Sequence, residues 1–560
     1  MSRSDRTSGV ALALALPAVA LLVVRPPELT PAGRVALGLF AAAGALLFAW
    51  RPMDWGAGSG RAAALLLPLA GASLLAAPCR ARALDEAAQL GALILIGLLG
   101  VAAARETRSW RLVPLLLVAL ASAAAAQAIT QAHWLYPRQA AVLREGGDPA
   151  SDNAILRLEA GRPAGPFLLP SSLGGFLALA LPSTLLLARR ASWWRGRLLG
   201  FAAALLQLYA LALTRSLGGL AAAAAGLLLI LPALVARRRI AFGLVVALLA
   251  FVLGGFFLHQ RRDEIAGGPG GDPLRLRAGN WRAAALMIED HPLLGVGPGS
   301  FGTAYARYMR AGMNETRYAH NSYLQAAACW GVWILGPLVA LLLSFLKATR
   351  RSVQDVEGAA GDAGQRLVVA AGAASLLLHN LIDFTLYLPG IAGWGALLVG
   401  MTLGAGNRPM AATSGLRPGS RLAALAAAAL IAWNALLAGR VEARMESARR
   451  AAEAGDVVQA AAEARRAMAA RSGSPEPWAF LAQLVLSHHM DDPALQNEGR
   501  SAADRAVRLD PESAILHHTR ALYLAAVGEK APAYLELAEA HRLYPLKETY
   551  RMPEAPEQSP

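Results

Sequence analysis

Long apolar runs with few charged residues recur along most of this chain, from near Val10 to near Ala438. Most of the runs have about 17 to 22 residues, and roughly 20 apolar residues allow a helix to cross a bilayer. Only 16% of the residues are charged, against about 25% in an ordinary soluble domain. Segments that cross a membrane are helices or the strands of closed barrels, and barrel strands alternate apolar with polar residues. These runs do not alternate, so the sequence predicts an all-α protein built on a polytopic transmembrane helix bundle.

The basic residues between the runs predict about 12 to 13 spans and their orientation. Short clusters of Arg and Lys follow alternate spans, and they fall on one face together with Arg3 and Arg6. Cytoplasmic loops are rich in Arg and Lys, so we expect a multi-pass inner-membrane protein with a cytoplasmic N-terminus. The expected spans are 10–24, 33–50, 61–78, 87–104, 112–129, 166–188, 198–213, 216–236, 240–258, 322–346, 366–385, 388–404 and 421–438.

Two long polar loops then fall on the opposite, extracytoplasmic face, at residues 130–165 and 259–321. Loops of this length between packed elements are usually functional or disordered. Both contain Trp, Tyr, Arg and His, so they are the expected location of any chemistry. Spans and loops together make up a predicted transmembrane domain over residues 1–439.

Beyond residue 439 the composition changes to Ala, Glu and Arg with helical periodicity. Pro475, Pro511 and Pro545 recur at intervals close to the period of about 34 residues that is typical of tetratricopeptide repeats. We therefore expect a helical-repeat domain over residues 440–546, outside the cytoplasm, followed by a disordered tail at 547–560. Such a domain is expected to dock an envelope protein partner or to form a rim over the membrane site.

The net charge of +15 does not indicate a nucleic-acid partner. The basic residues sit in short clusters between apolar runs and form no stripe interleaved with aromatic residues. Cys79 and Cys329 lie far apart and make neither a metal motif nor an evident disulfide framework. No metal-binding cluster of carboxylates is visible in the sequence, so neither a metal ion nor another cofactor is expected.

The densest motif lies at the end of the second long loop. It begins with Arg277-x-x-x-Trp281, continues as DHPLLGVGPGSF (290–301), and ends as AHNSYLQ (319–325) before an apolar run. Asn321 or Ser322 is a predicted N-cap of the following helix, which would place His320 at the membrane surface beside the positive helix end. The glycine-rich turn by itself is only weak support for anion binding.

Polar residues also occur inside a predicted span, at His379, Asn380 and Asp383. Polar side chains at membrane depth are costly and are often functional. Hydrogen bonds between helices explain these residues equally well.

The motif at 277–325 resembles the O-antigen ligase and O-antigen polymerase superfamily of bacterial membrane glycosyltransferases. Two other segments share the resemblance, namely Thr214-Arg215-Ser216 at the start of a membrane helix and GRPAGPFLLPSSLGGFLALALP at 161–182. The similar segments span about residues 160–400, and a C-terminal tetratricopeptide extension also occurs in such proteins. The resemblance is specific for the superfamily and does not separate its members.

The resemblance implies transfer of a glycan from a polyprenyl diphosphate carrier to the hydroxyl of a glycolipid or glycan acceptor at the outer membrane face, among membrane lipids. Negative charge develops on the leaving diphosphate, and Arg215 is the candidate that stabilises it. His320 is the candidate base or orienting group for the acceptor hydroxyl. A metal-independent mechanism is expected. The candidate substrate-binding residues are Arg277, Arg282, Asn321 and Arg162.

Several alternatives stay open. A ligase, a polymerase and a protein O-glycosyltransferase differ only in the acceptor, which the sequence does not reveal. A polysaccharide or lipid transporter would have a similar number of spans, but here the polar residues collect in outer loops and no inverted repeat stands out. A non-catalytic envelope scaffold would make Arg215 and His320 dispensable.

Overall fold

The computed structural model describes residues 68–146, 152–230, 273–357, 363–405, 418–488 and 492–551. These residues are helical apart from turns and loops, and none of them lies in a strand, in agreement with the predicted all-α class. The chain divides into two compact units. Unit 1 comprises Met1–Asp54, Gln89–Asp272 and Leu338–Ala432, and unit 2 comprises Trp55–Ala88, Pro273–Pro337 and Trp433–Pro560.

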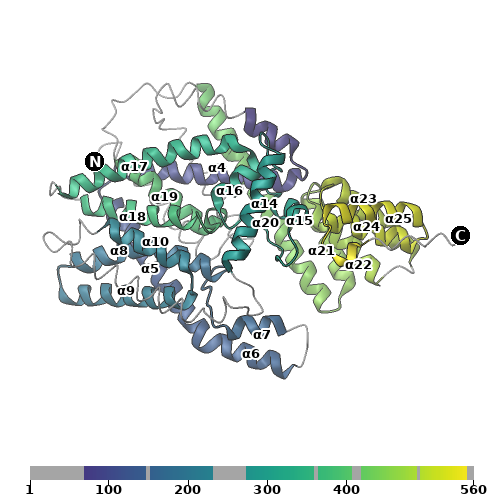
Figure 1. Ribbon diagram of the computed structural model, residues 1–560, viewed down its shortest axis with the longest axis horizontal. Helices are drawn as coiled ribbons and strands as arrows, with labels where there is room; N and C mark the ends of the chain where they lie inside the picture. The colour runs from purple at the N-terminus through teal and green to yellow at the C-terminus, as the bar shows by residue number, and fades with distance from the viewer. Residues whose placement is uncertain are drawn as a thin grey trace. The chain divides into compact units, whose positions relative to one another are not determined.

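Unit 1 is a bundle of apolar helices (Figure 1). Its central helix is α8 (Pro170–Arg190), in which 83% of the residues of the apolar stretch are buried. In α9 (Trp194–Thr214) only 22% of the corresponding residues are buried. α8 packs against α5, α9, α10 and α18. The other α-helices with described residues in this unit are α4 (Arg80–Ala103), α5 (Ser109–Thr130), α6 (Tyr136–Glu145), α7 (Asp152–Glu159), α10 (Leu217–Leu229), α17 (Leu335–Glu357), α18 (Ala363–His379), α19 (Pro389–Ala405) and α20 (Pro418–Glu453).

Within the described part of the chain, 6 helices are long and apolar enough to cross a membrane. They are Arg80–Ala103, Ser109–Glu145, Pro170–Arg190, Trp194–Thr214, Val332–Val356 and Leu425–Glu453. Shorter apolar helices, Leu217–Leu229 and Pro389–Ala405, fall at two further predicted spans. The predicted spans 10–24, 33–50 and 240–258 lie outside the described residues, as do parts of 61–78 and 216–236.

The prediction of one continuous span at 322–346 is wrong. The helix that begins at Ser322 ends at Trp330, and Gly331 has a positive φ of 97°. A Cβ atom on Gly331 would lie 2.2 Å from the carbonyl oxygen of Leu293, so only glycine permits this close approach of two backbone segments. The membrane-length helix starts after this break, at Val332.

Both regions predicted as long loops contain helices. Residues 130–165 include a π-helical turn, η1 (Gln131–Leu135), followed by α6 (Tyr136–Glu145) and α7 (Asp152–Glu159). Residues 259–321 include α14 (Pro273–Asp290) and α15 (Phe301–Tyr308). The described residues of these polar regions are therefore helical in part, at α6, α7, α14 and α15.

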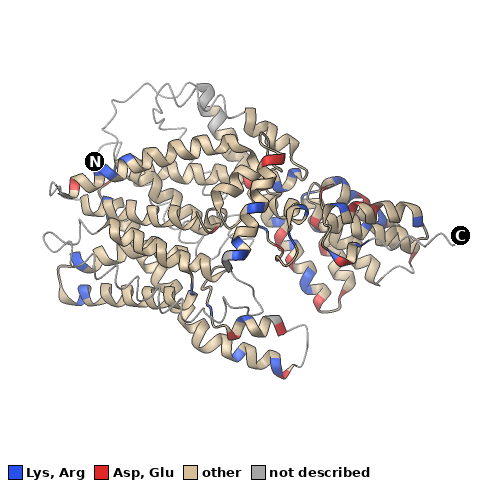
Figure 2. Ribbon diagram, in the orientation of Figure 1, with Lys and Arg blue, Asp and Glu red and all other residues tan. Residues whose placement is uncertain are grey.

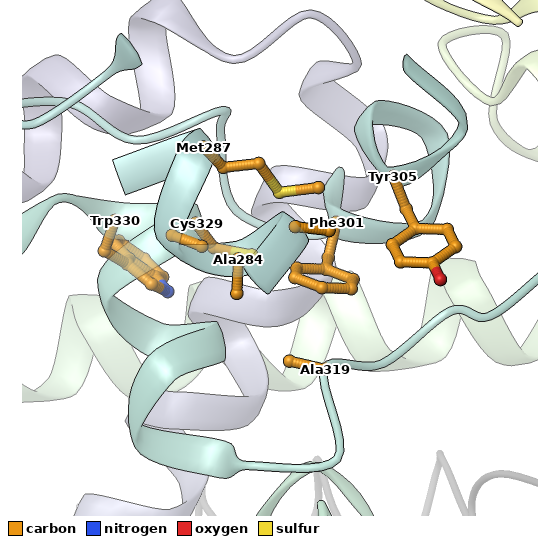
Figure 3. Packing of buried hydrophobic residues seen from close by; sticks show 9 residues of the cluster. Ala284, Met287, Phe301, Tyr305, Ala319, Cys329 and Trp330 are labelled. Atoms are coloured by element: carbon orange, nitrogen blue, oxygen red, sulfur yellow. The ribbon is translucent and has the colours of Figure 1, made fainter. Parts of the chain in front are cut away.

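Unit 2 is organised around α14, α15 and α16 (Ser322–Trp330). Met287 from α14, Phe301 and Tyr305 from α15, and Cys329 and Trp330 from α16 are buried in one apolar cluster (Figure 3). Ala319, one residue before His320, belongs to the same cluster. The segment that leads into α16 is therefore anchored in the core of the unit.

The C-terminal part of unit 2 is a series of helices, which we name the C-terminal module. Each helix packs on the next, and charged residues are frequent here although they are sparse along the bundle of unit 1 (Figure 2). Beyond them, the 3-10 turn η5 (Glu548–Tyr550) buries Tyr550 against Ala540 and Leu543. The tetratricopeptide identity of the module remains a prediction. Its helices are α21 (Val457–Ala470), α22 (Pro475–His488), α23 (Pro493–Leu509), α24 (Ala514–Ala526) and α25 (Lys530–Leu543).

We expect Gly400→Leu to destabilise unit 1, because α4 and α19 approach each other through glycine. A Cβ atom on Gly400 would lie 1.9 Å from the carbonyl oxygen of Gly97, and overpacking of this kind costs about 1–3 kcal/mol or more. Thermal unfolding in detergent should therefore start at a lower temperature. Gly336→Leu on α17 is the matched control, since nothing lies within 4 Å of its Cβ position. Equal melting temperatures for the two variants would contradict this packing.

Candidate functional site

Arg215 lies at the junction of α9 and α10 and has a left-handed backbone, with φ 51° and ψ 34°. The next residue, Ser216, caps α10 by accepting a hydrogen bond from the Gly219 amide at 3.1 Å. Thr214, on the other side, accepts a hydrogen bond from the Ser216 amide at 3.2 Å through its hydroxyl. Thr214 and Ser216 are buried and Arg215 is half-buried. The turn between two helices therefore fixes the position of the arginine backbone.

Arg162 contacts the same turn, because its Nε donates to the carbonyl oxygen of Thr214 at 3.1 Å. The segment that carries Arg162 is held by Gln131, whose side-chain amide bonds the backbone oxygen and nitrogen of Gly165 at 2.9 and 2.8 Å. Gln131 opens the π-helical turn η1, and such turns are frequent at functional sites. Unit 1 thus brings Arg162 to the turn of Arg215.

A buried polar pair lies beside the first turn of α10. His379 Nε2 is 3.7 Å from Asp383 Oδ2, and the two side chains are only 1% and 0% exposed. Small residues flank the imidazole: a Cβ atom would lie 2.6 Å from its Cδ2 if built on Gly175, and 3.2 Å from its Nδ1 if built on Gly218. Asn380, by contrast, forms hydrogen bonds with its own segment. Internal hydrogen bonding thus accounts for Asn380.

In unit 2, His320 directly precedes α16 and has a positive φ of 54°. Asn321 caps the helix, since its Oδ1 accepts hydrogen bonds from the amides of Tyr323 and Leu324, each at 3.0 Å. The carbonyl oxygen of His320 accepts a hydrogen bond from Trp281 Nε1 at 3.2 Å. The half-buried imidazole is therefore attached at the positive end of α16, and of the two predicted caps it is Asn321 that the structure uses.

The arginines of the motif lie on α14, which packs against α16. Arg277 is half-buried and precedes Trp281 by one helical turn, so it shares the face that contacts the His320 segment. Arg282 is exposed and lies off this face. Asn280 accepts a hydrogen bond from the Tyr305 hydroxyl at 2.8 Å, which fixes α14 on α15.

The glycine-rich turn at 295–299 is a packing element, and its amides are used within the protein. The amides of residues 296 and 297 donate to the carbonyl oxygens of Ala328 and Cys329 at 2.8 and 3.1 Å. The amide of Gly299 donates to the Glu86 carboxylate at 2.8 Å. The turn therefore holds the C-terminal end of α16 and has no row of free amides for an anion.

Arg215 and His320 share one unusual property. Among the described residues, they are the non-glycine residues with positive φ. A left-handed backbone costs a residue with a side chain about 1–2 kcal/mol, and such strain concentrates at functional sites. The two candidate catalytic residues are thus marked by their backbone conformation as well as by their side chains.

The predicted site residues fall into two sets. Arg162 and Arg215 belong to unit 1, whereas Arg277, Arg282, His320 and Asn321 belong to unit 2. Within the first set, one hydrogen bond joins Arg162 to the turn of Arg215. Within the second set, Trp281 joins the helix of Arg277 to His320.

Comparison with known protein families matches a central segment of the chain. Residues 202–339 match a family model described as O-antigen ligase. The matched segment contains Arg215, Arg277, Arg282, His320 and Asn321, and Arg162 precedes it. No curated protein matches the chain. The match supports a membrane protein with an O-antigen ligase or polymerase type of function, and a glycosyltransferase-like enzyme in general.

Proposed function

We propose that this protein transfers a glycan from a polyprenyl diphosphate carrier to an acceptor hydroxyl at the outer face of the inner membrane, as an O-antigen ligase does. The observation that carries the proposal is the coincidence of two independent signals at Arg215 and His320. Both lie in the segment that matches the O-antigen ligase family, and both have the strained left-handed backbone.

The proposed reaction is a displacement at the anomeric carbon of the donor glycan. The acceptor oxygen forms a new bond to this carbon, and its proton passes to a ring nitrogen of His320. The bond from the carbon to the diphosphate oxygen breaks, and its electron pair stays on the diphosphate. Arg215 stabilises the charge that develops there, because a guanidinium stays protonated and binds phosphate oxygens with paired N–H donors.

The remaining candidates have supporting roles in this proposal. Arg162 and Arg277 are half-buried cations that would bind phosphate or glycan oxygens, and Arg282 is more exposed and is expected to contribute least. The Oδ1 atom of Asn321 is occupied by the helix cap, so this residue acts mainly by holding His320 at the start of α16. The reaction requires no metal ion in this proposal.

A polymerase of the same superfamily is the second candidate, because the family match does not separate the two reactions. In that case the acceptor hydroxyl belongs to the next lipid-linked repeat unit. The diphosphate would leave in the same way, so Arg215 and His320 keep their roles. The product alone separates the two reactions.

The test is glycan transfer by the purified full-length protein in nanodiscs, with a polyprenyl-diphosphate oligosaccharide as the donor and EDTA present. Release of the lipid diphosphate together with a glycosylated lipid acceptor would support a ligase, and lengthening of the lipid-linked glycan would support a polymerase. Absence of turnover with either acceptor would contradict the proposal and favour a transporter or a scaffold.

A further inference from the structure

The turn between α23 and α24 carries two carboxylates that bind arginines outside the C-terminal module. Asp510 pairs with Arg82 at the start of α4, and Glu512 pairs with Arg307 of α15. The Asp510 side chain is only 3% exposed. A carboxylate buried this deeply needs its cation, because charge transferred out of water is costly unless it is paired. The module is therefore attached to the segments around α15 by specific ion pairs.

Arg82 extends this contact to the glycine-rich turn. Its Nη1 donates to the Thr303 hydroxyl of α15 at 2.7 Å. A Cβ atom on Gly299 would lie 2.8 Å from the Arg82 carbonyl oxygen, so the two backbones are in close contact. The pair of Arg82 with Asp510 thus reaches the turn that holds the C-terminal end of α16.

A second attachment lies close to His320 in the sequence. Glu315 Oε1 accepts hydrogen bonds from the Tyr544 hydroxyl and from Lys547 Nζ, each at 2.9 Å. The hydrogen bonds from Lys547 and then Tyr544 lower the pKa of Glu315, so this carboxylate stays ionised at neutral pH. The module accordingly contacts the segment 301–321 both at α15 and five residues before His320.

The segment between these contacts has no regular structure that could hold itself in place. Residues 309–321 connect α15 to α16 without a helix, apart from turns and bends. His320 nevertheless keeps a left-handed backbone, which persists only where the surrounding structure imposes it. Core packing of Ala319 and the Trp281 hydrogen bond hold the end of the segment at His320. The contacts of the C-terminal module add a restraint on its earlier part, at α15 and at Glu315.

We infer that Asp510, Glu512, Tyr544 and Lys547 are positioning residues for His320. The C-terminal module holds segment 301–321 so that the imidazole is presented in one geometry. The effect of this positioning on catalysis rests on the proposed function. The restraint on segment 301–321 does not depend on any reaction. The face of the module that carries these residues binds the protein's own chain.

The experiment is a charge swap at one ion pair in the full-length protein. Glu512→Arg and Arg307→Glu each place like charges together, and the double variant restores an opposite pair. We expect each single variant to speed amide hydrogen exchange of residues 301–321 by about tenfold and to lower kcat more than it raises KM. The double variant should return both quantities to within about threefold of wild type.

Glu498→Arg is the matched control. Glu498 pairs with Arg465 at 2.7 Å, and both residues belong to the module, so the same reversal should leave exchange of residues 301–321 unchanged. Glu315→Gln provides a second variant that removes no buried charge, and it should speed exchange around residues 311–319. Unchanged exchange in both Glu512→Arg and Glu315→Gln, or no recovery in the double variant, would overturn the inference.

The two readouts separate this inference from the proposed function. A wild-type protein without transferase activity, in which exchange still rises and recovers as expected, would overturn the proposed function and support the restraint. Normal transfer by wild type and by every swap variant would overturn the positioning role and leave the proposed function supported.

Discussion

Arg215→Asn is expected to lower the rate of glycan transfer by about 10²–10³-fold, the usual effect of removing one preorganised group that stabilises developing charge. Asparagine tolerates the left-handed backbone better than most residues, so the φ of 51° at this position should be retained. The melting temperature should therefore stay within the error of the wild-type value. Single-turnover transfer and thermal unfolding of the same preparation measure both quantities.

Arg138→Asn is the control for this substitution, because Arg138 is an exposed arginine on α6. It changes the net charge by the same amount without touching the turn at Thr214. Loss of transfer in both variants would point to a general effect of charge. Full activity of Arg215→Asn would remove Arg215 from the mechanism and favour its role as an interfacial anchor for lipid headgroups.

His320→Gly should separate stability from activity at the second strained residue. Glycine adopts positive φ without steric cost, so the variant should be as stable as wild type or more stable, by up to about 1–2 kcal/mol. Transfer should fall by about 10²–10⁴-fold if His320 takes the acceptor proton. The rate of glycan transfer at saturating donor and the thermal unfolding temperature test the two expectations.

His291→Gly is the matched control, since His291 is an exposed histidine after α14 in the same unit. Its replacement should leave the transfer rate near wild type. Partial rescue of His320→Gly by added imidazole would strengthen the assignment of a proton acceptor. Retention of the full rate without His320 would restrict this residue to a structural role at the helix end.

The membrane-length helices of the described residues were predictable from sequence because their apolar runs are long. The helices α6, α7, α14 and α15 lack such runs and were predicted as loops. The segment at 322–346 shows where this argument fails. Hydropathy continues smoothly through Gly331, so it gives no sign of a break. The break is imposed by the backbone around Leu293, a contact that the sequence alone does not reveal. The cap at Asn321 was predictable because an N-cap is a local feature with a local residue preference.

The left-handed backbones of Arg215 and His320 had no local signal. Arginine rarely adopts positive φ, and histidine does so more often than most residues but only where the surroundings impose it. Glu86 was also missed, although it binds the Gly299 amide and the Trp330 indole, each at 2.8 Å. The sequence signal that could have singled out Glu86 is its position as a carboxylate directly before an apolar run. Its partners lie more than 200 residues away, so the contact itself could not be predicted from one sequence.

The burial of Tyr550 limits where this chain can be cut or extended. The sequence pattern of the C-terminal helices stops near residue 546, which would suggest that point for a truncation or for attaching an affinity tag. Ending the chain there would remove Tyr550 and uncover Ala540 and Leu543, and it would delete Lys547, which binds Glu315. A tag placed after Arg551 keeps both contacts, so the safe point of attachment is set by one aromatic side chain.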